Sequence, residues 1–257
     1  QAGEGWMLRY PVRYPADSMI VEGLVAALKY SKKARKFPAE RDWQEYGLAR
    51  PSLKVGIETE GSPKRRYLYF GDPSPVGNFV FARWEGEKEY FLIQNQLKSI
   101  FSVSLYSLRM KRIFTLPLKD ISKISVRIGD EEFVVEKREK GWSWTEPAAL
   151  SGARLSKKRS KKILSSLGSL HVKEFLETEP IDAKSIFSPS PPLLEIVAEN
   201  GSQESLILGQ EFPEREAYYA TQKSEGVAVF LVSKDRIQNF FSLIQKSATK
   251  AIPSTGN

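Results

Sequence analysis

Gly141-Trp142-Ser143-Trp144-Thr145-Glu146-Pro147 is the stretch that decides the fold, because the sequence starts a second time there. It matches Gly5-Trp6-Met7-Leu8-Arg9-Tyr10-Pro11, in which Trp6 precedes Trp142 by 136 positions. Such an internal repeat predicts two copies of one folding unit, and it constrains the architecture before any single element is considered.

The residues that follow the two copies correspond as well. Their order is kept along the chain, and their separation changes by only a few positions, as loops of different length would cause. The matched pairs are Asp42 with Asp182, Pro51 with Pro191, Gly71 with Gly209, Phe91 with Phe230, and Phe101 with Phe241. Chance matches between apolar residues would not keep this order.

Each copy has the same predicted elements. A short tryptophan-containing strand ends at a proline, which lacks the amide donor that a strand ladder needs. An amphipathic helix, an aspartate-containing loop, several short strands and a closing helix follow. Alternating apolar residues predict these strands at 53–59, 67–70, 79–83 and 89–93, and again at 193–198, 205–208, 217–221 and 227–232.

The predicted fold class is therefore α+β, with two tandem pseudo-equivalent units that each consist of an antiparallel β-sheet and amphipathic helices. We place the first unit at 1–107, the second at 108–245 and a disordered tail at 246–257. The second unit opens with an extra β-meander, since 122–128 and 132–137 alternate around the turn Gly129-Asp130. Nothing equivalent precedes Trp6, so we expect the first unit's meander to lie upstream of Gln1. Trp142 is expected to be buried where its strand meets the following helix.

Composition removes much of the usual catalytic chemistry. Among the 257 residues there is no cysteine and one histidine, His171, which excludes disulfides, thiolate metal sites and cysteine nucleophiles. The sequence contains no glycine-rich phosphate loop and no metalloprotease motif. His171 is expected to stabilise the end of a helix. We predict no catalytic residue, no metal and no cofactor.

The acidic residues are only weak candidates for a catalytic site. Asp130-Glu131-Glu132 and Glu177-Thr178-Glu179 lie in predicted exposed turns, which do not separate two pKa values as acid–base catalysis requires. Asp42 and Asp182 recur in both copies, and we expect each to bond local backbone amides. An enzyme would become the better interpretation if either aspartate lay in a closed pocket with a raised pKa.

The net charge is +8, and the cations are concentrated in one place. Six of the nine residues from 154 to 162 are basic and none is acidic: Arg154, Lys157, Lys158, Arg159, Lys161 and Lys162. Most lie in the first turns of a predicted helix capped by Ser156, where the helix dipole disfavours positive charge. Two interpretations stay open: a solvated helix face, or a site for an anionic partner such as lipid headgroups, an acidic protein or a polyanion. Nucleic acid is disfavoured because no aromatic residue interleaves the cluster.

The motifs of the first copy resemble the bacterial domain of unknown function 4340 family. They are Trp6 followed by Pro11, then Tyr46-Gly47-Leu48 followed by Pro51, a strand that closes on Gly71, and the strand at 79–83. The family's Leu-Arg-Asp-Lys element corresponds to Leu108-Arg109-Met110-Lys111, with methionine in place of the acid. In the second copy, Ile186-Phe187-Ser188 replaces the Tyr-Gly-Leu element.

This resemblance implies a periplasmic or cell-envelope protein that is tethered by an N-terminal transmembrane helix absent from this chain. It also implies association with ATP-driven transport systems similar to the gliding-motility type, and it supplies no catalytic residues. The first functional hypothesis is thus a non-catalytic extracytoplasmic module with a protein partner in a membrane complex. The alternative is a binder of an anionic ligand, including an anionic membrane surface, through residues 154–162.

Overall fold

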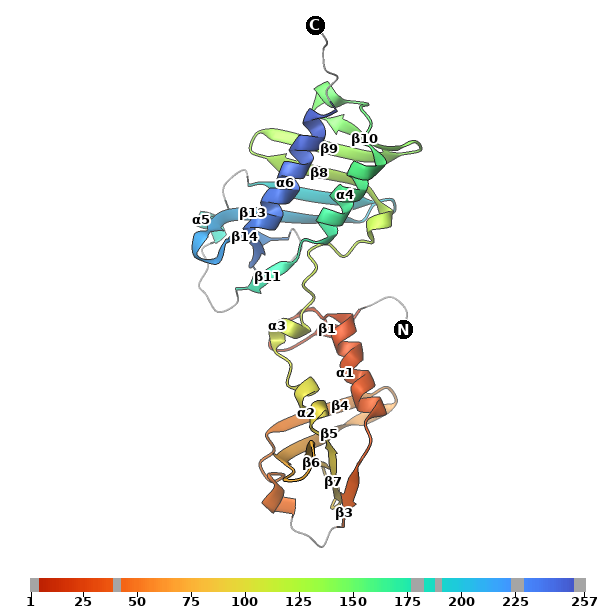
Figure 1. Cartoon of the computed structure of the whole chain (residues 1–257), viewed down its shortest axis with the longest axis vertical. Helices are drawn as coiled ribbons and strands as arrows, with labels where there is room; N and C mark the ends of the chain where they lie inside the picture. The colour runs from red at the N-terminus through yellow and green to blue at the C-terminus, as the bar shows by residue number, and fades with distance from the viewer. Residues whose placement is uncertain (1–4, 39–42, 177–182, 188–190, 223–228, 252–257) are drawn as a thin grey trace. The chain divides into compact units, whose positions relative to one another are not determined.

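The computed structural model describes residues 5–38, 43–176, 183–187, 191–222 and 229–251. The chain divides into two compact units, Gln1–Met110 and Lys111–Asn257 (Figure 1). Helices and antiparallel sheets occur in both units, which confirms the predicted α+β class.

The N-terminal unit contains a two-stranded and a five-stranded sheet, and every paired strand is antiparallel. The small sheet pairs β1 (Met7–Leu8) with β2 (Tyr14–Pro15). The large sheet has the order β3 (Arg35–Phe37), β7 (Tyr90–Gln94), β6 (Phe79–Trp84), β5 (Ser62–Pro73) and β4 (Leu53–Thr59). The helices are α1 (Ser18–Tyr30), α2 (Asn95–Phe101) and α3 (Leu105–Leu108), and η1 (Trp43–Tyr46) is a 3₁₀ turn.

Local chemistry fixes the ends of α1. The Asp17 carboxylate accepts hydrogen bonds from the amides of Met19 and Ile20 at 3.1 and 3.3 Å, which satisfies donors that have no partner within the helix. At the other end, the Ser31 hydroxyl donates to the Leu28 carbonyl at 2.8 Å. Between these ends, Ala27 and Leu28 pack against the sheet core.

Both faces of the five-stranded sheet are apolar. One face places Leu68, Phe70 and Phe91 against residues of α1 and α2. The opposite face packs Phe81 and Tyr90 against the loop that contains η1, through Leu48, Tyr46 and Trp43. The alternation along β5 and β6 therefore divides the side chains between two small cores.

The C-terminal unit is built on one eight-stranded antiparallel sheet. Its order is β10 (Gly141–Glu146), β9 (Glu131–Arg138), β8 (Ile121–Ile128), β12 (Leu193–Ala198), β13 (Gln203–Phe212), β14 (Ala217–Thr221), β15 (Phe230–Ser233) and β11 (Val172–Phe175). The helices are α4 (Lys157–Gly168), α5 (Ala183–Ile186) and α6 (Lys234–Thr249), with the 3₁₀ turns η2 (Leu118–Asp120), η3 (Ala148–Leu150) and η4 (Pro213–Arg215).

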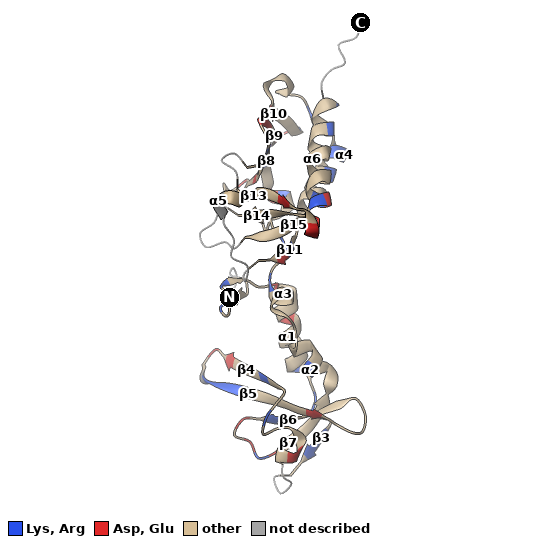
Figure 2. Cartoon of the chain, turned by 90° about the vertical axis from the view of Figure 1, so that its left-hand side faces the viewer, with Lys and Arg blue, Asp and Glu red and all other residues tan. Residues whose placement is uncertain are grey.

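The predicted meander forms the β8–β9–β10 end of this sheet. Its tryptophans enter a continuous core with residues of α4 and α6, which lie side by side on one face of the sheet (Figures 1 and 2). Trp142 is 9% exposed and Trp144 is 1% exposed, so the predicted burial of Trp142 is confirmed. Ile163 and Leu167 of α4 belong to the same core.

The two units share an order of elements. Strands β3-β7-β6-β5-β4 follow one another as β11-β15-β14-β13-β12 do, and the tryptophan segment precedes the first helix in each. The Trp6 carbonyl accepts from the Ala16 amide, and the Trp142 carbonyl accepts from the Leu155 amide, both at 2.8 Å. Residue-by-residue superposition of the units remains a prediction.

One predicted boundary is wrong. Helix α6 continues to Thr249, and Ser247 and Ala248 are buried, so the tail cannot begin at 246. Polar residues in this last turn conceal the helix in the sequence, whereas the buried alanine completes its apolar face. Residues 252–257 of the expected tail lie outside the described ranges.

Candidate functional site

The basic cluster lies on the exposed side of α4. Its N-cap Ser156 accepts a hydrogen bond from the Arg159 amide at 3.4 Å, and the buried Ile163 and Leu167 turn one face toward the core. Lys157, Lys158, Lys161 and Lys162 are all exposed, whereas Arg159 is half-buried. Arg159, four residues before Ile163, lies closest to the buried face because of the helical period.

The basic groups of the cluster form no ion pair with any described residue. Within the described ranges, no carboxylate comes within 4 Å of its basic groups. Other cations of the same unit do have partners, as Lys137 does in Glu199 at 2.7 Å. Figure 2 marks the basic residues along α4 in blue. The positive end of the helix dipole adds to their field.

Arg154 belongs to a second, adjoining feature. Residues 153–155 extend the sheet beyond β10, since the Trp144 amide donates to the Ala153 carbonyl at 2.9 Å. This pairing places Arg154 beside the β9–β10 turn, where it lines a shallow hollow of about 390 Å³ with Arg138 and Lys140. Glu139 also lines the hollow, and Arg138 contacts Glu136 at 3.4 Å.

The sequence alone did not group Arg138 and Lys140 with the cluster. The sequence does show that these residues are basic and close together, because Lys137-Arg138-Glu139-Lys140 lies between two strands of the predicted meander. What was missing is the pairing of Ser143 with Arg154, which no local pattern reveals. The structure thus brings Arg154 to the turn residues and leaves the four lysines on the helix that follows.

The remaining candidates have local roles or lie outside the described ranges. The His171 ring nitrogen Nδ1 is 2.7 Å from the carbonyl of Ser169, the C-cap of α4, in agreement with a role at the helix end. Asp130, Glu131 and Glu132 are exposed at the β8–β9 turn. Asp42, Asp182, Glu177 and Glu179 are not among the described residues, so the structure leaves their expected roles open. In the part of the chain that is described, no three or more Asp, Glu or His side chains form a metal-binding group.

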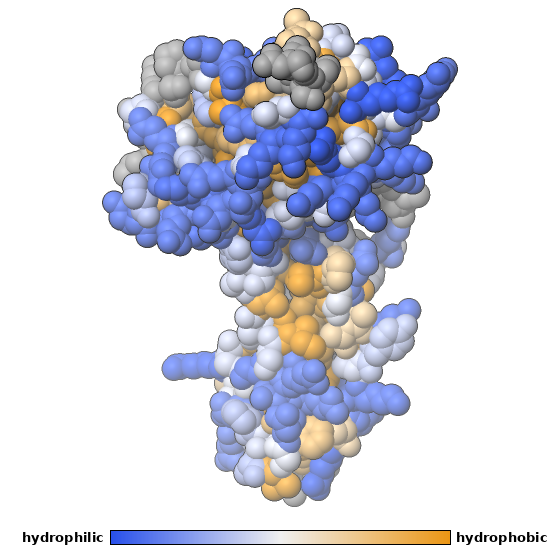
Figure 3. Space-filling view, turned by 45° about the horizontal axis from the view of Figure 1, so that its top comes forward, coloured by the Kyte–Doolittle hydropathy of each residue, from blue (hydrophilic) through white to orange (hydrophobic). Residues whose placement is uncertain are grey.

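Hydrophilic residues dominate the visible face of the C-terminal unit, whereas apolar residues gather on the N-terminal unit (Figure 3). In α1, which has no fully buried residue, Met19 is 79% exposed and Val25 is 49% exposed. Every helix in the described ranges is too short or too polar to cross a membrane.

Comparison with known proteins places the chain in a family. No curated protein and no solved structure matches it. The family model described as "Domain of unknown function (DUF4340)" matches residues 6–189. This match covers the N-terminal unit from Trp6, the meander, the basic helix and β11, and it ends before β12. Because it spans more than half of the sequence, the chain belongs to the DUF4340 family.

Proposed function

We propose that this protein is a non-catalytic, extracytoplasmic module of a membrane-associated complex, and that its α4 face binds an anionic membrane surface. The observation that carries the proposal is the uncompensated basic face of α4, with four exposed lysines and no ion pair among the described residues. Association with an ATP-driven transport system similar to the gliding-motility type is part of the same proposal.

The form of the cluster favours a surface over a compact ligand. Exposed lysines carry point charges on flexible stems and do not preorganise a bidentate site. The hollow around Arg154 is shallow and bears both signs of charge through Glu139. A layer of anionic headgroups can neutralise many separate cations at once, with about 1 kcal/mol from each Lys or Arg close to the leaflet.

The test is binding to vesicles. We expect the protein to bind vesicles of phosphatidylglycerol and phosphatidylcholine, and not vesicles of phosphatidylcholine alone. Replacement of Lys157, Lys158, Lys161 and Lys162 by glutamine should weaken binding more than about tenfold, since 1.4 kcal/mol corresponds to tenfold. Salt should weaken it too, because the Debye length falls from about 10 Å at 0.1 M to about 3 Å at 1 M. Vesicle co-sedimentation measures both effects.

The matched control removes the same charge elsewhere. Lys32, Lys88, Lys119 and Lys250 are exposed and have no ion pair within the described ranges, so their replacement by glutamine lowers the net charge equally. The control should retain most of the binding. Thermal stability of the α4 variant should hold or rise slightly, because lysines near a helix N-terminus oppose the dipole. Equal losses in both variants, or no binding by the unmodified protein, would contradict the proposal.

A further inference from the structure

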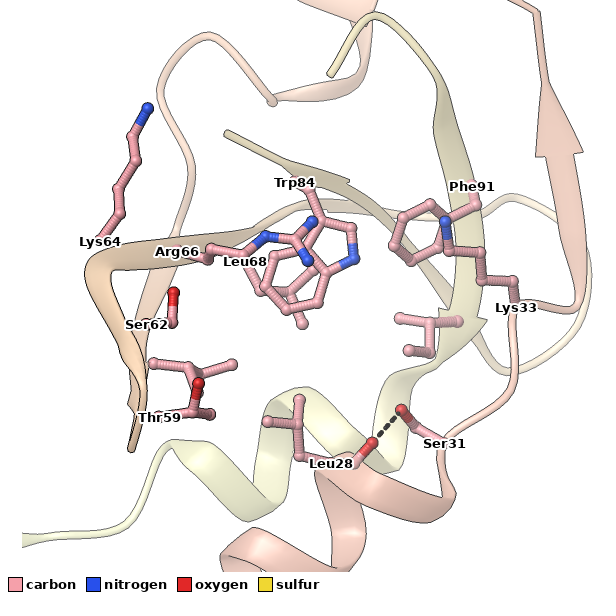
Figure 4. Close-up of a pocket in the computed structure, with 12 residues that line it drawn as sticks. Leu28, Ser31, Lys33, Thr59, Ser62, Lys64, Arg66, Leu68, Trp84 and Phe91 are labelled. Carbon is pink, nitrogen blue, oxygen red and sulfur yellow. Dashed lines mark hydrogen bonds between the residues drawn. The ribbon is translucent and has the colours of Figure 1, made fainter. Parts of the chain in front are cut away.

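The N-terminal unit contains an open groove on the sheet face that α1 and α2 cover in part (Figure 4). Its volume is about 380 Å³. The buried Leu68 and Phe91 form an apolar floor, and Leu28 of α1 points in from the side. The cations at its rim are Lys33, Lys64 and Arg66. Among the described residues, no acidic side chain lines it.

The C-terminal unit fills the corresponding place with its own chain. Residues 111–116 run beside the residues that follow α4: the Val172 amide donates to the Lys111 carbonyl at 2.8 Å, and the Ile113 amide to the Leu170 carbonyl at 3.4 Å. The adjacent side chains of Ile113 and Phe114 are buried in the main core. A segment with two adjacent buried apolar side chains therefore completes this unit.

Two polar side chains of the sheet hold the same segment. The Gln222 side chain donates to the Ile113 carbonyl at 2.5 Å. The Glu204 carboxylate accepts from the amides of Thr115 at 2.8 Å and Leu116 at 3.2 Å. The backbone of the segment thus has fixed partners at both ends.

The positions of these partners correspond to residues that line the open groove. In the sheets, Phe70 lies opposite Ala82 as Leu208 lies opposite Ala220. The edge strands agree where Arg35 pairs with Leu92 as Glu174 pairs with Leu231, and β11 has a bulge just before this point. These registers match Arg66 with Glu204 and Trp84 with Gln222. Counting back along the chain from Arg35 and Glu174 matches Ser31 with Leu170 and Lys33 with Val172. All four residues of the N-terminal unit line the groove.

The sheet edge beside the groove also has no paired strand among the described residues. In the C-terminal unit, the segment continues into β8, which pairs with β12 from Ile121 to Arg127. The corresponding strand β4 pairs with β5 alone and ends the five-stranded sheet formed by the described residues. An unpaired edge presents backbone donors and acceptors to any strand that can align with it.

We propose that this groove and the open edge of β4 bind an extended segment of a partner protein, which adds a strand to the sheet. The segment carries two adjacent apolar side chains for the floor and a carboxylate for the rim. The main-chain pairing with β4 is the usual source of affinity in strand addition, and the side-chain pockets give specificity.

The charge of the groove indicates which kind of segment it binds. Where the C-terminal unit has Glu204, the groove has Arg66, whose guanidinium lies 4.7 Å from the Trp84 ring centroid and contacts Glu87 at 2.9 Å. A guanidinium has five donors and can bind a second carboxylate. The chain's own segment is basic at Lys111, Arg112 and Lys123, which disfavours a second copy of this protein as the occupant.

The test uses synthetic peptides on the intact 257-residue protein. One peptide has the sequence of residues 111–128 with Lys111→Glu and Thr115→Glu. Thr115→Glu puts a carboxylate toward Arg66, because the Thr115 hydroxyl contacts the matched Glu204, and Lys111→Glu removes a cation from the residue that pairs with the match of Lys33. The control peptide has the unaltered sequence. We expect the acidic peptide to bind at least about fivefold more tightly, as replacing like charges by an exposed ion pair does. The protein variant Arg66→Glu should reverse this preference.

Two structural measurements complete the test. Hydrogen exchange should show new protection of the amides at 53–59 when the acidic peptide binds. A peptide that is N-methylated at the alternate residues facing β4 should not bind and should not protect the amides at 53–59. This experiment requires no variant of the protein. The proposal is overturned if amides 53–59 gain no protection or if N-methylation has no effect. It is also overturned if the β4 edge is already protected in the free protein, or in a longer protein whose own residues upstream of Gln1 pair with β4.

Discussion

At the residue scale, the matched tryptophans have different environments. Trp142 is 9% exposed and packs in the main core, whereas Trp6 is 47% exposed. Their carbonyls nevertheless accept equivalent hydrogen bonds from Leu155 and Ala16. The backbone role of this position is thus shared, but only in the C-terminal unit does the side chain have a full complement of neighbours.

This difference gives a paired prediction. Trp142→Ala should lower the free energy of unfolding by about 3–5 kcal/mol, the range for a large aromatic side chain removed from a core. Trp6→Ala should change it by less than about 1 kcal/mol, as expected for a surface position. Chemical denaturation monitored by circular dichroism measures both values. Equal effects of the two substitutions would show that the core does not depend on Trp142.

At the element scale, each unit brings a loop very close to its sheet. A Cβ atom at Gly71 of β5 would lie 2.2 Å from the Tyr46 carbonyl oxygen, and one at Gly209 of β13 would lie 2.6 Å from Ile186 Cγ2. Both glycines thus permit a close approach that no other residue allows. In the N-terminal unit this approach lets the loop with Tyr46 and Leu48 cover Phe81 and Tyr90.

Gly71→Ala should therefore destabilise the protein by about 1–3 kcal/mol, the usual cost of overpacking. The matched control is Gly23→Ala in α1, where a Cβ meets nothing within 4 Å; it should stabilise the helix by up to about 1 kcal/mol. Thermal melts of the two variants measure the opposite shifts. A neutral Gly71→Ala substitution would show that the loop can move away from β5 without loss.

At the scale of the whole molecule, the two units have separate cores. The main core of the C-terminal unit draws on β8–β10, α4 and α6, whereas the clusters of the N-terminal unit are smaller. The meander contributes the buried residues Ile124, Val126 and Phe133. It also pairs with β12, which would otherwise be an open edge like β4.

The fragment 111–257 should consequently fold by itself and melt in one cooperative transition. The shorter fragment 141–257 lacks β8 and β9 and should be unfolded or strongly destabilised, because it loses core residues and exposes the β12 edge. Calorimetry and near-ultraviolet circular dichroism of the two fragments measure the difference. A well-folded 141–257 would show that the meander is not needed for the stability of this unit.

Much of the local structure was predictable from residue patterns. Alternation located the β4 and β12 strands, and Gly129-Asp130 marked the β8–β9 hairpin, because both signals arise between near neighbours in the chain. The strands β3 and β11 were missed. Each is short, and β3 contains only Arg35, Lys36 and Phe37, so they exist through pairing with β7 and β15 rather than through propensity.

The sequence by itself determined the class of fold, the order of elements common to both units, the burial of Trp142 and the concentration of cations at 154–162. Only the tertiary structure decided which cations lie near Arg154, which edge of the five-stranded sheet is unpaired, and that the segment containing Thr115 binds Glu204. The reason is physical. Periodicity and capping depend on residues a few positions apart, whereas strand pairing, groove filling and ion-pair formation depend on groups that only long-range folding brings into contact.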